Sequence, residues 1–566
     1  MDFLPINKKE MASFGWDEID IILVTGDAYI DHPAFGVAIL GRFLQSKGYR
    51  VGIIPQPEKD DDYQALGRPK LFFGVSSGNV DSMVCHYTAQ KKIRSEDDFT
   101  PNNKAGVRPD RAVLVYTQKI KQLFKDIPVV IGGTEASNRR IPHYDYWSNK
   151  VKNSILIDSK ATILVYGNGE RQIEAIAYNI ANSKPILDIR GTCVLAKEKP
   201  PTGVKLTDFS TVSTPDNFYK MTKVFYENFT TQTLYYKHNE RYLIHYPPAV
   251  PLSTSEIDTV YNLPFCREPH PKYKGKFIKA FEQIKYSVLS HRGCYGGCSF
   301  CSIGISQGKT IQNRSKESIL AELKAINQKP YFKGTITDIA GASANMYGTF
   351  CKAKISHTCL KQSCLYPEIC PNLVFNDKPY IALLKAASQV KGIKNVFISS
   401  GVRFDLALKQ HDFIQDLCVF YTSGLLKLAP EHNHPAVLSL MYKPSFQKYQ
   451  QFAGVYFDIC KKLSKQQFII PYLIVGFPGC TLADAFKLHE YLKQNNMHIE
   501  QIQEFTPTPM TIATMMYYTG INYYNGQQIY VPKGRDIRLQ KALAQWFIKD
   551  NKKLVAEAFK KLEIRN

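Results

Sequence analysis

The sequence predicts an α/β protein in which two sets of short apolar strands alternate with helices. The first set lies in the N-terminal third, at residues 19–25, 50–54, 71–75, 128–131 and 163–166. These strands are apolar on both faces and most precede a glycine, which is typical of a doubly wound parallel sheet covered by helices. The second set has six strand candidates separated by helix-length spacers, at residues 284–290, 335–340, 395–400, 424–429, 468–475 and 499–505.

Length and composition indicate a multidomain protein. The chain has 566 residues, 44% of them hydrophobic, so we expect about two or three domains. No run of 18 apolar residues is present, and the first residues lack a secretory pattern, so we expect no membrane span and a cytoplasmic location. In that compartment, the 13 cysteines are expected to serve metal binding or catalysis before disulfides.

The chain is basic, with 72 Lys and Arg against 50 Asp and Glu, a formal net charge of +22. A basic surface attracts nucleic acid, whereas a lysine-rich solvated surface needs no polyanionic partner. The sequence has no compact Arg/Lys block, RNP motif or zinc finger. RNA therefore stays an alternative partner, and the rival function is a non-enzymatic RNA-binding protein stabilised by zinc or an iron–sulfur cluster.

A group of cysteines follows the first strand of the second set. Cys294, Cys298 and Cys301 have the spacing C-x3-C-x2-C, with Gly296 and Gly297 between the first two. Because a strand is predicted before them and a helix after them, they lie on a loop at the C-terminal end of a strand. Thiolates are ligands of iron–sulfur clusters, and glycines without a Cβ let a loop wrap closely around one.

Three ligands instead of four distinguish this loop from most cysteine motifs. A [4Fe–4S] cluster usually takes four protein thiolates, so three leave one iron open for the amino and carboxylate groups of S-adenosylmethionine (SAM). An electron from the reduced cluster would cleave the sulfonium to a 5′-deoxyadenosyl radical. The alternatives are a zinc loop or three buried thiols. Zinc sites usually show C-x2–4-C pairs and a fourth ligand, so the spacing favours the cluster.

The motif C-x3-C-x-aromatic-C resembles the signature of the radical SAM superfamily. The wider text, His-Arg-Gly-Cys-Tyr-Gly-Gly-Cys-Ser-Phe-Cys at residues 291–301, resembles the YgiQ-type family, and phrases similar to that family recur along nearly the whole chain. The resemblance implies a partial (β/α)6 radical SAM barrel with its site at the C-terminal strand ends. It also implies an enzyme of unknown substrate that takes electrons from a donor such as a flavodoxin or ferredoxin.

The strand ends of this barrel carry candidate SAM contacts. Gly341 lies in a loop similar to the family's Gly-Gly-Pro-Thr-Ala-Asn-Met-Tyr, which in the superfamily meets the SAM amino group. Ser400 and Arg403 follow the third strand, and a guanidinium matches carboxylate geometry, so we expect Arg403 to pair with the SAM carboxylate. Lys427 lies on the fourth strand. For each residue the alternative is a surface turn or an ordinary ion pair.

A second group of cysteines lies between the second and third strands, at Cys351, Cys359, Cys364 and Cys370. Four thiols in one short insertion fit a closed site for a second iron–sulfur cluster or zinc. The alternative is buried thiols, which behave as small hydrophobic side chains. We expect a metal site with a structural or electron-relay role.

The N-terminal sheet resembles the cobalamin-binding domain that precedes many radical SAM cores. The cobalt-ligating pattern there is Asp-x-His-x-x-Gly, whereas here His32 directly follows Asp31 and stands four residues before Gly36. We therefore expect no His-ligated cobalt and a domain that kept the fold without cobalamin.

These patterns predict four segments along the chain. They are a cobalamin-binding-like α/β domain (1–191), an irregular proline-containing connector (192–279), a radical SAM core (280–534) with a Cys-rich insertion (351–373), and C-terminal helices (535–566).

Overall fold

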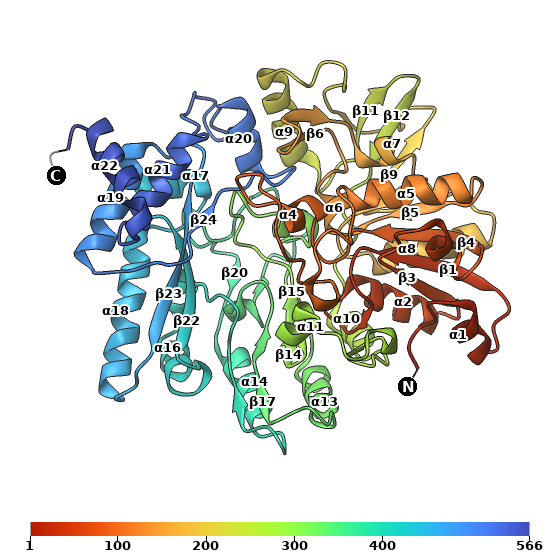
Figure 1. Ribbon diagram of the computed structural model, residues 1–566, viewed down its shortest axis with the longest axis horizontal. Coiled ribbons are helices and arrows are strands. Elements are labelled where there is room, and N and C mark those ends of the chain that lie inside the picture. The colour runs from red at the N-terminus through yellow and green to blue at the C-terminus, as the bar shows by residue number, and fades with distance from the viewer. Residues whose placement is uncertain (1, 565–566) are drawn as a thin grey trace. The chain divides into compact units, whose positions relative to one another are not determined.

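A computed structural model describes residues 2–564 (Figure 1). The chain forms two compact units. The first runs to Lys285 and also includes Ile305–Gln307 and His357–Leu360; the second comprises Tyr286–Gly304, Gly308–Ser356 and the chain from Lys361 on. No helix in the described part of the chain is long and apolar enough to cross a membrane.

The first unit is built on a nine-stranded mixed sheet of order β10-β11-β12-β9-β8-β5-β4-β1-β3. Its parallel strands match the predicted set and are β3 (Val51–Pro55), β1 (Ile19–Thr25), β4 (Pro69–Ser76), β5 (Val129–Ile131) and β8 (Ile163–Val165). β1 and β3 are buried along almost their whole length, as expected for strands covered on both faces.

The strand order reverses between β1 and β4, because β1 connects to β3 on one side and the sheet continues through β4 on the other. Right-handed crossovers then place helices on both faces. α2 (Gly36–Ser46) packs with α8 (Glu170–Ala181), whereas α5 (Ala112–Leu123) packs with α7 (Ile155–Ser159) (Figure 1). In such sheets ligands bind at the reversal, beside the carboxyl ends of the strands.

Residues 192–279 extend the sheet, where an irregular connector was expected. β9 (Thr192–Ala196) runs antiparallel to β8, and the hairpin of β11 (Leu234–His238) and β12 (Arg241–His245) continues from it, with β10 (Val204–Lys205) at the edge. Two helices complete the segment, α9 (Pro215–Asn228) and α10 (Thr254–Tyr261). The prolines lie mainly between these elements, or at the first turn of α9, where a proline removes no helical hydrogen bond.

The second unit contains the six predicted strands. β14 (Ser287–Leu289) pairs with β18 (Asp338–Ala340), β17 (Thr335–Ile336) pairs with β21 (Asn395–Val396), and β22 (Leu425–Glu431) pairs with β23 (Phe468–Val475), which also pairs with β24 (Gln503–Glu504). Every one of these pairings is parallel. The predicted fold class, a doubly wound sheet followed by a partial β/α barrel, is confirmed.

Helices cover the outer side of these strands. α13 (Lys316–Asn327), α14 (Lys378–Ser388) and α18 (Phe446–Lys462) share one core with β18 and β22, and Figure 1 shows α18 alongside β22 and β23. α19 (Leu482–Gln494) begins with a capping box at Thr481 and packs on β23. The predicted C-terminal helices are α21 (Arg535–Ala544), which packs on α19, and α22 (Lys552–Lys561).

Candidate functional site

The loop that carries Cys294, Cys298 and Cys301 lies in the second unit, and its base is closed by a short ladder. β15 (His291–Arg292) pairs antiparallel with β16 (Gln312–Asn313) on the far side of the loop. Gly293 enters the loop with φ 91°, and a Cβ there would lie 2.2 Å from the carbonyl oxygen of Thr310. Only glycine allows this approach, so the base of the loop is fixed by its sequence.

Two thiols of the loop, those of Cys294 and Cys298, lie near Gly296. A Cβ on Gly296 would lie 3.4 Å from Cys294 Sγ and 3.9 Å from Cys298 Sγ. Burial raises the pKa of Cys294, and it raises the pKa of Cys301 to about 12; in both cases the nearby Cys298 adds to the rise. Closely spaced thiolates repel one another, and a bound metal centre reverses that cost because its own charge stabilises them.

The donor set therefore fits an iron–sulfur cluster. Within residues 2–564, no three Cys, His, Asp or Glu side chains are arranged so that they could hold a metal ion without rearrangement. Cys294, Cys298 and Cys301 are free thiols, and their ligation of a cluster stays a prediction.

Buried charged side chains surround this loop. Arg403 and Asp405 form a bidentate pair, with Nε 2.9 Å from Oδ1 and Nη2 2.7 Å from Oδ2. Lys443 Nζ lies 3.5 Å from Glu431 Oε1. Burial has the larger effect on the pKa of Cys294, but both cations act in the opposite direction and lower it. The loop thus lies among two cations and two carboxylates that are almost withdrawn from water.

Ser400, a predicted SAM contact, binds Asp338 on β18, and Lys427, another predicted contact, acts on the same carboxyl electrostatically. Ser400 donates its backbone N–H to Asp338 Oδ1 at 3.2 Å and its hydroxyl to Oδ2. Burial raises the pKa of Asp338, and Lys427 on β22 partly opposes the rise. Sequence reasoning gave Asp338 no role, and the available signal was a carboxylate within an otherwise mostly apolar strand.

The other two predicted SAM contacts, Gly341 and Arg403, lie against other parts of the protein. A Cβ at Gly341 would lie 2.5 Å from the carbonyl oxygen of His291, so the missing side chain lets the end of β18 approach that residue. Arg403 is fixed by Asn345, whose side chain accepts the Arg403 N–H and donates to the Arg403 carbonyl, both at 2.9 Å. Contact of Gly341 and Arg403 with SAM stays a prediction.

The Cys-rich insertion binds the cysteine loop through three successive residues. β19 (Phe350–Cys351) and β20 (Leu373–Val374) pair and close the insertion. Gln362 donates its amide to the Gly297 carbonyl at 2.8 Å, and Ser363 donates its hydroxyl to the Gly296 carbonyl at 2.7 Å. The N–H of Cys364 donates to the carbonyl of residue 295 at 3.0 Å. The insertion therefore holds the loop at the point where its thiols converge.

The structure brings together two of the four insertion cysteines. Cys370 donates its N–H to the Cys364 carbonyl at 2.8 Å, and both side chains pack against the apolar cluster that Cys294 also contacts. Cys351 lies on β19, and Cys359 belongs to the first unit. A second metal site at these cysteines stays a prediction.

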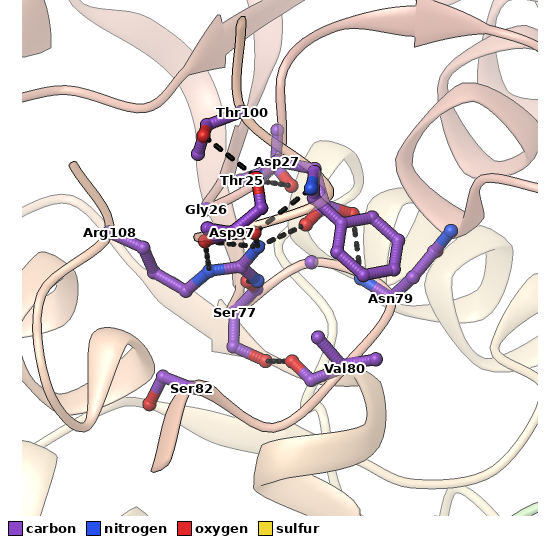
Figure 2. Close-up of polar contacts among 12 residues, drawn as sticks. Thr25, Gly26, Asp27, Ser77, Asn79, Val80, Ser82, Asp97, Thr100 and Arg108 are labelled. Carbon is purple, nitrogen blue, oxygen red and sulfur yellow. Dashed lines mark hydrogen bonds and ion pairs between the residues drawn. The ribbon is translucent and has the colours of Figure 1, made fainter. Parts of the chain in front are cut away.

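At the strand-order reversal of the first unit, the carboxyl ends of β1 and β4 carry a buried ion network (Figure 2). Arg108 Nη2 lies 2.9 Å from Asp27 Oδ1 and 3.2 Å from Asp97 Oδ2. Asp27 also accepts the N–H of Asn79 at 2.7 Å. One cation serves two carboxylates, and burial raises the pKa of Asp27 to about 6. These side chains lie where a doubly wound sheet meets its ligand.

His32 is buried, and both of its ring nitrogens face hydrogen-bond donors. Nδ1 accepts the N–H of Ala34 at 3.1 Å, and Nε2 lies 2.8 Å from Nη2 of Arg267. The preceding Asp31 instead pairs with Arg42, with Nε 3.2 Å from Oδ1. His32 therefore links the segment after β1 to Arg267, and the expected absence of His-ligated cobalt stays a prediction.

Several partners in these sites gave no signal in the sequence. Asp405 and Lys443 lie far from the cysteine loop in the sequence. Only folding brings them close enough to affect it. The Sγ atoms of Cys418 and Cys460 lie 3.2 Å apart in the core of the second unit. No local spacing links residues so far apart in the sequence.

Comparison with known proteins finds family models over two parts of the chain and relatives over nearly its whole length. A family model described as Radical SAM N-terminal matches residues 3–287, and a domain of unknown function, DUF3362, matches residues 500–565. A UPF0313 protein of Methanocella arvoryzae is 47% identical, over 98% of this chain and 94% of its own. The UPF0313 protein YgiQ of Escherichia coli is 42% identical, over 98% of this chain and 85% of its own.

One solved structure with a related fold is the radical SAM methyltransferase TsrM from Kitasatospora setae, with cobalamin and a [4Fe–4S] cluster bound. It is 13% identical with a TM-score of 0.50, over 95% of this chain and 89% of its own. The expectation that the N-terminal sheet lacks cobalamin finds no support in this likeness, since TsrM carries cobalamin. That expectation rested on the position of a single histidine.

Proposed function

Because the chain belongs to the UPF0313 family of radical SAM proteins, we propose that it is an enzyme that reductively cleaves SAM at a [4Fe–4S] cluster held by Cys294, Cys298 and Cys301. The observation that carries the proposal is that the Cys294 and Cys298 thiols both lie near Gly296, inside a loop fixed on several sides and followed by Cys301. Three protein thiolates leave one iron of such a cluster without a protein ligand.

The cysteine loop is also held by contacts with residues outside the insertion. Ser299 donates its N–H to the Met441 carbonyl at 3.0 Å and its hydroxyl to the Leu440 carbonyl at 2.7 Å, both at the end of α17 (Pro435–Met441). The N–H of Ala513 donates to the Ser299 carbonyl at 2.9 Å. Ligands fixed by their surroundings lose little freedom when they bind, which favours a tightly held centre.

The bound cluster supplies the one-electron chemistry, and the residues of this chain bind and orient SAM beside it. Lys427 offers a cation for the SAM carboxylate, and Ser400 offers a hydroxyl that Asp338 already orients. Gly341 leaves the backbone at the end of β18 without a side chain. Gly341 directly follows the C-terminal end of β18, where such folds gather their sites, whereas Lys427 is the third residue of β22.

The test is SAM cleavage by protein reconstituted without oxygen. Wild-type protein with iron, sulfide and dithionite should convert SAM to 5′-deoxyadenosine and methionine, and the variant with Cys294, Cys298 and Cys301 all changed to Ala should not. Cys85→Ala, which removes a thiol of the first unit, is the control and should cleave SAM as the wild type does. Cleavage that survives in the triple variant, or wild-type protein that leaves SAM intact, contradicts the proposal; the latter is the result that a non-enzymatic RNA-binding protein would give.

A further inference from the structure

Arg403 is held in one orientation by partners on both its backbone and its side chain. Asn345 makes two hydrogen bonds to its backbone, at 2.9 Å each. Asp405 binds Nε at 2.9 Å and Nη2 at 2.7 Å. Arg403, Asn345 and Asp405 are all buried, so this arrangement is shielded from water and has little freedom to change.

The remaining guanidinium nitrogen, Nη1, points toward the cysteine loop. It lies 4.0 Å from Cys298 Sγ. It also lies 3.3 Å from the position that a Cβ would take on Gly296, which is the point where the Cys294 and Cys298 thiols converge. The bidentate contact with Asp405 therefore aims the third nitrogen at a cluster ligand.

From this geometry we infer that Arg403, oriented by Asp405, is a positioning residue that donates an N–H to the Cys298 thiolate of the bound cluster and raises the reduction potential of that cluster. The inference rests on the proposed function, because it needs a cluster at Cys298. A reduced cluster carries one more negative charge than the oxidised one. Hydrogen bonds to its sulfurs and a nearby cation stabilise the reduced form more, and they are recognised means of tuning such potentials.

This role differs from the pairing of Arg403 with the SAM carboxylate. Asp405 already occupies the side-on edge of the guanidinium, Nε and Nη2, so a side-on bidentate pairing of Arg403 with the SAM carboxylate is blocked. Displacing Asp405 would leave a buried carboxylate without its partner, which is strongly unfavourable. The sulfur contact needs only Nη1 and disturbs neither partner.

The experiment is a redox titration of the reconstituted full-length protein, followed by EPR, with Arg403→Gln and Asp405→Asn compared with the wild type. In Arg403→Gln the charge and the N–H near Cys298 are lost, so the reduction equilibrium should shift about tenfold toward the oxidised cluster, or about 59 mV for a one-electron couple. In Asp405→Asn the guanidinium is no longer neutralised, so the potential should shift in the opposite direction. A purely structural role would move both variants in the same direction.

Arg403→Lys keeps the positive charge and guards against a glutamine variant that does not fold. Its potential should lie between those of the wild type and Arg403→Gln, with SAM affinity within about threefold of the wild type. Equal potentials in all proteins, or a large loss of SAM affinity with an unchanged potential, would overturn the inference. Wild-type protein without any cluster signal would overturn it together with the proposed function, and that result is seen before any variant is measured.

Discussion

Asp27 illustrates how one buried side chain can make the stability of the protein depend on pH. Its carboxyl shares Arg108 with Asp97, so a single cation faces two acids in a site shielded from water. Burial raises the pKa of Asp27 to about 6 from its ordinary 3.8. The folded chain therefore holds this proton to a higher pH than the unfolded chain does, and stability is lost as the pH rises from about 4 through 6.

Changing Asp27 to Asn removes this loss, because an amide has no proton to release. Relative to the wild type, the variant should gain up to about 3 kcal/mol in free energy of unfolding between pH 4 and pH 7. The measurement is urea unfolding of the full chain at several pH values. Asp126→Asn is the control: Asp126 is exposed beside Arg68, which lowers its pKa, so this variant should show no such gain. Parallel pH profiles for wild type and Asp27→Asn would disprove the coupling.

Among single residues, those whose chemistry depends on their spacing along the chain could be predicted from the sequence. The three loop cysteines stand within eight residues, and their glycines belong to the same motif. The partners of Ser400 and Arg403 could not be predicted in this way. Asp338 reaches Ser400 from another strand, and the contact of Arg403 with Cys298 joins residues that lie 105 positions apart. Such contacts are set by packing, which a single sequence does not specify.

Among the elements, the junction between the Cys-rich insertion and the cysteine loop depends on a close backbone approach at one glycine. Gly297 has φ 65°, and a Cβ there would lie 2.4 Å from the carbonyl oxygen of Gln362. The left-handed backbone alone costs a residue with a side chain about 1 kcal/mol, and the overlap with backbone atoms adds to it. The insertion can therefore approach the loop only because residue 297 is glycine.

Gly297→Ala should separate the insertion from the loop and weaken cluster retention. We expect a lower melting temperature and less iron per chain after gel filtration. Gly304→Ala is a matched control in the same unit, because a Cβ there meets no atom within 4 Å. If both variants keep the same iron content, the close approach of the insertion has no part in holding the cluster.

The hydroxyl of Ser363 gives a second test of this junction. It donates to the Gly296 carbonyl and accepts the N–H groups of Leu365 and Tyr366 at 3.0 and 3.1 Å. Ser363→Ala leaves these buried groups unpaired, at a cost of about 1–3 kcal/mol, and should speed the release of iron to a chelator. Ser388→Ala, which removes a hydroxyl bonded within α14, should leave the release rate unchanged. Equal rates in the two variants would mean that the hydroxyl does not hold the loop.

The hydrophobic pattern of the sequence predicted the strands correctly where they are apolar and long, as in β1, β22 and β23. Residues 192–279 were harder to predict, because their strands have at most five residues and several are polar on one face. In strands this short, the alternation of polar and apolar side chains is a weak signal. The prolines in the neighbouring connections are a stronger one, and they favour the prediction of an irregular segment. Pairing with β8, already placed by the parallel strands, is what orders β9 and the hairpin.

Across the whole molecule, the net charge of +22 bears on the choice of electron donor. A strongly basic protein attracts an acidic partner over long distances, and salt screens that attraction. An acidic flavodoxin should therefore reduce the reconstituted protein about tenfold more slowly at high salt than at low salt. The control is a flavodoxin whose acidic surface residues have been neutralised. If its reduction rate shows the same salt dependence, charge attraction does not guide the donor.

The assignment of Cys294, Cys298 and Cys301 to one cluster with an open iron is tested most directly by EPR of the reduced protein with and without SAM, alongside iron and sulfide analysis. The wild type should bind about four iron and four sulfide per chain at this site, and SAM should shift its spectrum because it binds the iron that no thiolate occupies. Changing the three cysteines to Ala should remove both the spectrum and the response to SAM. A spectrum that ignores SAM, or one that persists in the triple variant, would contradict the assignment.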